Sequence, residues 1–120
     1  MNTLEQLREH SIVVADTADL QAIEAFNPID ATTNPSLILK QAQTEATAGL
    51  ITETKNGLKT GRFVSAAEAA LDLSVRFGVE IAKRIQGYVS TEVDARLSFN
   101  KARSIEQAHS ILKKYQALGI

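Results

Sequence analysis

The stretch Ile-Val-Val-Ala-Asp at residues 12–16 decides the fold class, because it sets four apolar residues in a row and ends them on a carboxylate. A continuous apolar run of this kind is typical of a strand that is buried on both faces. Such strands belong to parallel sheets, whose faces are covered by the helices that connect the strands. We therefore expect residues 12–15 to form the first strand of a parallel sheet.

The sequence before and after this strand predicts further helices and strands. A short N-terminal helix places Leu4 and Leu7 on one side, and a second helix, which Thr17 or Asp19 can cap, follows the strand. A short second strand is expected over residues 29–34. Together these elements form a strand-helix-strand unit.

The rest of the chain repeats the alternation of helix and strand. A proline at position 35 suits the first turn of a helix, and residues 44–60 have a diffuse helical pattern. Ser65 opens a long helix that ends at Gly87, residues 88–93 form a third strand, and Ser104 opens the last helix. Both serines begin a Ser-x-x-Glu or Ser-x-x-Gln capping box.

This order of elements calls for a parallel sheet with right-handed helical crossovers. Two architectures fit it: a small doubly wound sheet, or an incomplete (β/α)8 barrel of the TIM type, which normally needs about 250 residues. Three strands in 120 residues cannot close a barrel. In either architecture the sheet keeps unpaired edges, so we expect a partner chain or further sequence to cover them.

Composition excludes several classes of function. Hydrophobic residues make up 44% of the chain and charged residues 22%, which is ordinary for a globular domain, and the net charge of −1 offers no footprint for nucleic acid or an anionic membrane. The absence of cysteine excludes thiolate zinc sites and thiol nucleophiles. His10 and His109 have no carboxylate cluster at ligand spacing, so we expect no metal. The first residues carry no export signal, which favours a cytoplasmic location.

Polar side chains follow each predicted strand. Asp16 ends the first, Asn34 ends the second, and Glu92 lies at the end of the third. In parallel α/β folds the carboxyl ends of the strands meet at one edge, where active sites lie. Two carboxylates and an amide at such an edge could perform acid-base chemistry on a polyhydroxylated substrate.

Each of these residues also has a purely structural interpretation. Asp16 could cap the helix that follows it, and Asn34, before a proline, could be a turn residue. Glu92 could form a buried ion pair with Arg96 or another basic side chain. Asp94 is interpreted as the structural partner of the same arginine at the end of the strand.

Three segments, in order along the chain, resemble transaldolase. They read Val-Val-Ala-Asp-Thr at 13–17, Asp-Ala-Thr-Thr-Asn-Pro-Ser-Leu-Ile-Leu-Lys at 30–40, and Ser-Thr-Glu-Val-Asp-Ala-Arg-Leu-Ser at 90–98. The likeness spans essentially the whole chain, although it is diffuse over 41–63. Ala18 stands where many members of the family have glycine, which is a mild departure.

The resemblance implies a (β/α)8 barrel of the class I aldolase type, which acts in the pentose phosphate pathway without a metal or organic cofactor. Such an enzyme transfers a dihydroxyacetone unit between sugar phosphates through a lysine Schiff base. Asp16 would be the acid-base group, Glu92 would act through a water during formation and hydrolysis of the Schiff base, and Asn34 would bind the dihydroxyacetone hydroxyls.

The resemblance also points to a missing group, because the Schiff-base lysine of transaldolases sits on the fourth strand, beyond Ile120. The seven lysines of this chain lie in or beside predicted helices. We therefore expect residues 1–120 to be a single N-terminal part of a transaldolase-like barrel that is inactive alone. Its expected partners are sugar phosphates and either a second copy or a complementing C-terminal fragment. The alternative is a non-catalytic α/β module that assembles through its exposed sheet edges.

Overall fold

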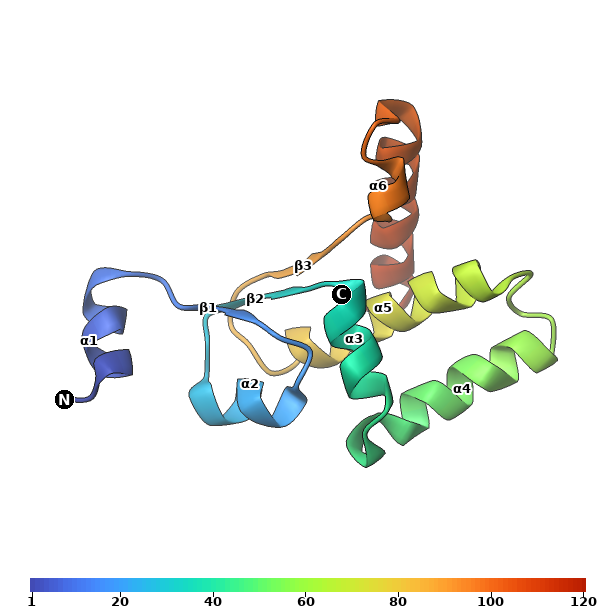
Figure 1. The fold of residues 1–120 in the computed structure, drawn as a ribbon. Helices are drawn as coiled ribbons and strands as arrows, with labels where there is room; N and C mark the ends of the chain where they lie inside the picture. The colour runs from blue at the N-terminus through green and yellow to red at the C-terminus, as the bar shows by residue number, and fades with distance from the viewer.

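The computed structural model describes residues 1–120 and has the predicted alternation of helices and strands (Figure 1). Its regular elements are α1 (Thr3–His10), β1 (Val14–Asp16), α2 (Leu20–Phe26), β2 (Asp30–Thr33), α3 (Pro35–Ala42), α4 (Ala48–Lys59), α5 (Ala66–Ala82), β3 (Val89–Thr91) and α6 (Lys101–Ala117). Two single-turn 3-10 helices, Glu45–Thr47 and Ala95–Leu97, precede α4 and α6. None of the helices combines the length and the apolar character that crossing a bilayer requires.

The three strands form one parallel sheet in the order β1-β2-β3. Ala15 of β1 is in register with Ala31 of β2, which is in register with Val89 of β3. Each crossover between strands contains at least one helix, so successive strands add to the same side of the sheet. The predicted α/β class with three parallel strands is confirmed, and the arrangement is consistent with part of a (β/α)8 barrel.

The helices cover only one face of this sheet. Ala31 and Thr33 of β2 are buried beneath them, whereas Thr32, between the two, lies on the other face and is partly exposed. The expectation that residues 12–15 form a strand buried on both faces is therefore wrong. The strand begins at Val14, whose side chain is 49% exposed because no element packs on its face.

Helix α5 is the centre of the apolar core. Three small clusters of buried side chains exist, and α5 contributes to all of them: Ala18, Ile38 and Phe77; Ile23, Ala31 and Ile81; Val75, Val79 and Ile111. Through these clusters α5 packs against α3, against α2 with the sheet, and against α6. The prediction that the long helix is well buried is confirmed.

A charged network joins α5 to its two neighbouring helices. Asp72 is buried, and its carboxylate accepts hydrogen bonds from Arg76, one turn later at 2.7 Å, and from the Lys114 ammonium of α6 at 3.4 Å. Arg76 also contacts Glu53 of α4 at 2.8 Å. A buried carboxylate is costly unless it is paired, so these contacts fix how α4, α5 and α6 sit together.

The two predicted capping serines behave differently. Ser65 caps α5, because its hydroxyl accepts the backbone N–H of Glu68. The last helix, in contrast, begins at Lys101 and is capped by Asn100, whose side chain accepts the N–H of Arg103. Ser104 lies inside the helix and donates to a carbonyl of the preceding turn. Asparagine competes well with serine as a cap, so the earlier start adds one helical turn.

Two parts of the chain extend from the sheet in opposite directions (Figure 1). The hairpin of α4 and α5 runs well beyond the carboxyl ends of the strands. At the other end α1 stands apart and has no buried residue. The Arg8 guanidinium links α1 to the body by donating to the carbonyls of Phe26 and Asn27, where α2 ends.

A close contact between α5, α6 and β3 depends on a glycine. The Tyr115 hydroxyl lies 2.5 Å from Oγ1 of Thr91, the last residue of β3. It reaches that position over Gly78, where an added Cβ would overlap the hydroxyl and lie 3.2 Å from Thr91 Oγ1. Burial raises the pKa of the Tyr115 hydroxyl, so it stays protonated and can donate this hydrogen bond.

The substitution Gly78→Ala is expected to lower the free energy of unfolding by about 1–3 kcal/mol, because the methyl group overlaps Tyr115 and α6 must shift. Urea unfolding followed by circular dichroism measures the change. Gly49→Ala in α4 is the matched control: its Cβ meets no atom within 4 Å, and helix propensity alone predicts a gain of up to ~1 kcal/mol. An unchanged midpoint for Gly78→Ala would contradict the close packing.

Candidate functional site

Asp16, the last residue of β1, lies on the open face of the sheet and is exposed. Its carboxylate accepts a hydrogen bond of 3.0 Å from the hydroxyl of Thr32, its register partner on β2. The alternative that Asp16 caps the next helix is wrong, because Asp19 performs that task by accepting the N–H groups of Gln21 and Ala22. Asp16 is therefore oriented by a neighbouring strand and has an oxygen open to solvent.

Asn34 follows β2 directly and caps α3. Its Oδ1 accepts the backbone N–H of Leu37 at 3.0 Å, and Pro35 occupies the first helical position. The structural role of Asn34 is therefore that of a helix cap and not of a turn residue. The same contact fixes the rotamer of Asn34 and leaves the amide Nδ2 group without a protein partner.

Glu92 comes directly after β3 and is exposed. The interpretation of a buried ion pair with Arg96 is wrong, since Arg96 pairs instead with Asp94 at 2.5 Å. The reason is that Asp94 caps the 3-10 turn that contains Arg96 and so holds the guanidinium, while Glu92 is exposed just beyond the end of β3. The proposed structural pair of Asp94 and Arg96 is confirmed.

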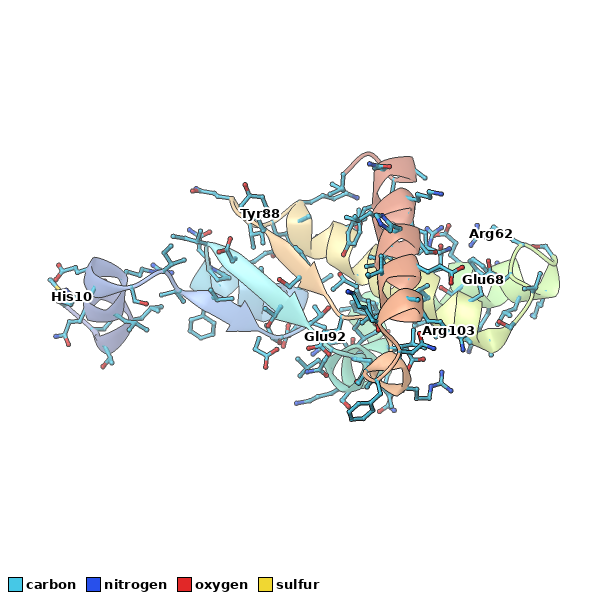
Figure 2. All side chains as sticks on the ribbon, turned by 90° about the horizontal axis from the view of Figure 1, so that it is seen from above. His10, Arg62, Glu68, Tyr88, Glu92 and Arg103 are labelled. Carbon is cyan, nitrogen blue, oxygen red and sulfur yellow. The ribbon has the colours of Figure 1, made fainter.

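The structure brings the three predicted residues to one edge of the sheet. Asp16, Thr32 and Ser90 are in register with one another and form one row across the sheet. Asn34 and Glu92 each lie two residues further along the chain from this row, one residue beyond the ends of β2 and β3. Neighbouring strands are about 4.8 Å apart, so Asp16 on β1 and Ser90 on β3, at the two ends of this row, are separated by roughly 10 Å. In the view from above, Glu92 lies at the carboxyl end of the sheet, on the side toward α6 (Figure 2).

Thr32 joins the site although its role was not assigned from the sequence. Its hydroxyl holds Asp16, and its backbone carbonyl accepts the N–H of Thr17. The signal that could have identified it is the two-residue period of a strand, which places Thr32 on the same face as Asn34. Thr33 shows the opposite case, since its hydroxyl is buried on the helix side without a hydrogen-bond partner.

An open groove of about 500 Å³ borders Glu92 on the side toward the helices. Its lining combines the starts of α3 and α5 with the segment after β3: Pro35, Ala67, Glu68, Ala70, Leu71, Ser74, Glu92, Asp94, Ala95, Arg96 and Gln107. Three carboxylates but one guanidinium line it, so the groove is acidic. Within the groove Asp94 accepts the side-chain and backbone N–H groups of Arg96, which lowers the pKa of the Asp94 carboxyl from 3.8 to about 2.

This edge carries no lysine amine and no cluster of side chains that could hold a metal ion. All seven lysines lie on helices or at a helix end, and none lies on a strand: Lys40 on α3, Lys55 and Lys59 on α4, Lys83 at the end of α5, and Lys101, Lys113 and Lys114 on α6. No group of three His, Cys, Asp or Glu side chains is placed to hold a metal ion. The arrangement offers proton transfer and hydrogen bonding to a hydroxylated ligand.

Comparison with known proteins gives a consistent result. The family model for Transaldolase/Fructose-6-phosphate aldolase matches residues 13–119. The chain is 52% identical over 122 residues to a transaldolase of Shewanella woodyi and 49% identical over 125 residues to a transaldolase of Methylococcus capsulatus. Each match covers 99% of this chain, and the chain spans about 38% of the length of these curated relatives.

The Asp94 carboxyl provides a direct test of the geometry beside Glu92. Its pKa is lowered, so the carboxylate contributes to stability above pH 3.8 and that contribution is lost as the pH falls from about 3.8 toward 2. Arg96→Gln is expected to raise the pKa of Asp94 most of the way toward 3.8, measured by carbon-detected NMR titration of the carboxyl. Arg103→Gln, which removes an arginine that pairs with no carboxylate, should leave the value near 2. An unchanged Asp94 titration in Arg96→Gln would show that the pair does not form.

Proposed function

The chain belongs to the transaldolase/fructose-6-phosphate aldolase family, and from this premise we propose that residues 1–120 are the N-terminal part of a transaldolase-like barrel. In this proposal the chain supplies the acid-base and substrate-holding residues of a site that transfers dihydroxyacetone units between sugar phosphates. The observation that supports it is that Asp16, Asn34 and Glu92 all lie at the carboxyl ends of neighbouring strands, at one edge of the sheet.

The proposed reaction begins when a lysine amine adds to the carbonyl of a ketose phosphate and water leaves. Asp16 then takes the proton from the hydroxyl beside the carbon-carbon bond, which breaks and releases an aldose phosphate. The remaining three-carbon enamine adds to the aldehyde of a second aldose phosphate, and Asp16 returns the proton. Fructose 6-phosphate and sedoheptulose 7-phosphate are the expected ketoses.

The other two side chains have supporting roles in this proposal. The free amide group of Asn34 donates to an oxygen of the dihydroxyacetone unit, and the helix cap on its other side keeps it in place. Glu92 is exposed to solvent at the neighbouring strand end, where it can act through a water molecule while the Schiff base forms with loss of water and while water hydrolyses it. No metal or organic cofactor is needed for these steps.

The amine that makes the covalent bond is proposed to come from outside these 120 residues. A Schiff-base lysine must lose its proton near neutral pH, which requires desolvation or cationic neighbours. The most shielded lysine, Lys114, is instead paired with the Asp72 carboxylate on the helix side of the sheet. We therefore expect the chain alone, in a cytoplasmic setting, to be inactive until a complementing fragment supplies that lysine. A second copy could cover the sheet but would bring no further kind of amine.

Trapping the covalent intermediate tests this division of roles. The chain incubated with fructose 6-phosphate and borohydride should gain no sugar adduct by intact mass. When it is co-expressed with the part of the Methylococcus capsulatus transaldolase that it leaves unmatched, the adduct should form on that part. An adduct on a lysine of this chain would refute the proposal, and a complete complex that makes no adduct would favour the non-catalytic module.

Two substitutions separate catalysis from folding in the same complex. Asp16→Asn is expected to reduce the rate of dihydroxyacetone transfer by about 10²–10⁴-fold, because the amide cannot take the proton. Asn34→Asp should keep the helix cap and the thermal midpoint, because aspartate caps equally well, while transfer falls as the amide donor is lost. Glu9→Gln on α1 is the control for a changed carboxylate and should leave transfer unchanged. Equal transfer rates in all four proteins would remove both residues from the site.

A further inference from the structure

The side chain of Glu92 has no partner that holds it in place. Its carboxylate is exposed and lines the open groove of about 500 Å³, and the nearby Arg96 is paired with Asp94. A carboxylate that acts through a water molecule must nevertheless lie at a defined place beside the reacting atoms. The structure can define that place through the backbone on either side of Glu92.

Side chains of α6 hold this backbone before and after Glu92. On the N-terminal side, the Tyr115 hydroxyl lies 2.5 Å from Oγ1 of Thr91. On the C-terminal side, Oε1 of Gln107 accepts the backbone N–H of Asp94 at 2.5 Å. The two hydrogen bonds bracket Glu92 along the chain, and we call Gln107 and Tyr115 the α6 clamp.

Both clamp residues belong to one face of α6. Gln107, Ile111 and Tyr115 follow one another at intervals of four residues, which places them along one side of the helix. Ile111, between the two polar contacts, is 5% exposed and packs on α5, and Val93 packs against the same apolar cluster. Glu92 lies at the carboxyl end of the sheet, on the side toward α6 (Figure 2). A packed helix face therefore holds the neighbours of Glu92 while its own carboxylate stays open to solvent.

We propose that the α6 clamp positions Glu92 for the steps in which the Schiff base forms and is hydrolysed, so that Gln107 and Tyr115 are positioning residues of the site. This inference rests on the proposed function, which gives Glu92 its role through water. Asp16 is held separately, by a hydroxyl of β2. Loss of the clamp should therefore slow the steps that involve water and leave the proton transfer at Asp16 unchanged.

The two kinds of step differ in the bonds that they change. When the Schiff base forms, the lysine nitrogen bonds to the ketone carbon, its two protons pass to the ketone oxygen through water and Glu92, and that oxygen leaves as water. Hydrolysis is the reverse of this sequence. In the transfer step a carbon-carbon bond breaks or forms while Asp16 takes or returns a hydroxyl proton, and no water is gained or lost.

The test uses the complex of this chain with the unmatched part of the Methylococcus capsulatus transaldolase. Borohydride trapping and intact mass measure two rates: the appearance of adduct from fructose 6-phosphate, and the conversion of the three-carbon adduct to a seven-carbon adduct by erythrose 4-phosphate. Gln107→Met and Tyr115→Phe should each slow adduct formation about tenfold, and the double variant up to about 10²-fold, because Glu92 is misplaced. The rate of conversion should not change.

Matched controls remove the same chemical groups where they hold nothing. Gln116→Met changes an exposed glutamine of the same helix, and Tyr88→Phe removes the hydroxyl of a side chain that is 85% exposed. Both should leave the two rates unchanged. Thr91→Val should reproduce the effect of Tyr115→Phe, whereas Thr91→Ser keeps the hydroxyl and should keep the unmodified rate. Circular dichroism checks that every variant folds.

The order of the Glu92 backbone is a second measurement, and it needs no activity. In the chain alone, nitrogen relaxation should give the Glu92 amide an order parameter of about 0.85, as in rigid backbone. In the double variant of Gln107→Met with Tyr115→Phe the value should fall below about 0.6.

The outcomes separate the clamp from the proposed function. Unchanged order at Glu92 in the double variant, equal slowing of adduct formation and conversion, or equal slowing by the control variants would overturn the clamp. Loss of order at Glu92, together with no adduct from the unmodified complex, would retain the clamp as the element that fixes Glu92 and would reject the proposed function.

Discussion

The packing of α5 is the constraint on which the rest of the structure depends. This one helix supplies Phe77, Ile81 and Val75 to three separate apolar clusters, and its Asp72 holds α6 through Lys114. No cluster is large, so the core is a row of small contacts along a single helix. The contact of Tyr115 over Gly78 extends this row to the end of β3. Because Thr91 is the last residue of β3, its contact with the helices fixes the direction in which the chain leaves the strand.

The candidate site follows from coverage of one sheet face only. Because α2 and α5 cover one side, the alternate residues on the other side are free to be polar, and Asp16 and Thr32 form a hydrogen-bonded pair there. Asn34 is held by the helix that it caps, so its geometry also depends on regular structure. The side chains at this edge are therefore positioned by strand register and a helix terminus, which are more rigid than a free loop.

The sequence predicts the order of elements and the edge where the polar residues meet, because both follow from apolar runs and from the rule that parallel strands share a carboxyl edge. Prediction from the sequence fails where burial, a helix start or an ion pair depends on residues that become neighbours only in the folded chain. The burial of residues 12–15 depends on whether a second layer of helices or strands covers the other face of the sheet, and no local sequence pattern predicts that. The capping box at Ser104 is a local signal that predicts the start of α6 there, while Asn100 supplies an equally good cap one turn earlier in the chain. Arg96 lies inside the 3-10 turn Ala95–Leu97, which Asp94 caps, so the arginine pairs with Asp94 and not with Glu92.

The cap at the start of α3 gives the proposed ligand contact a direction. One lone pair of the Asn34 carbonyl oxygen is used by the N–H of Leu37, whereas both hydrogens of its amide group are available to a ligand. A sugar hydroxyl that accepts from this amide must turn its own hydrogen elsewhere, and the carboxylates of Asp16 and Glu92 are the acceptors that the flanking strands provide. A helix cap ordinarily satisfies an unpaired backbone N–H group at the start of a helix. Here the same cap also orients the Asn34 amide group as a hydrogen-bond donor toward the proposed ligand.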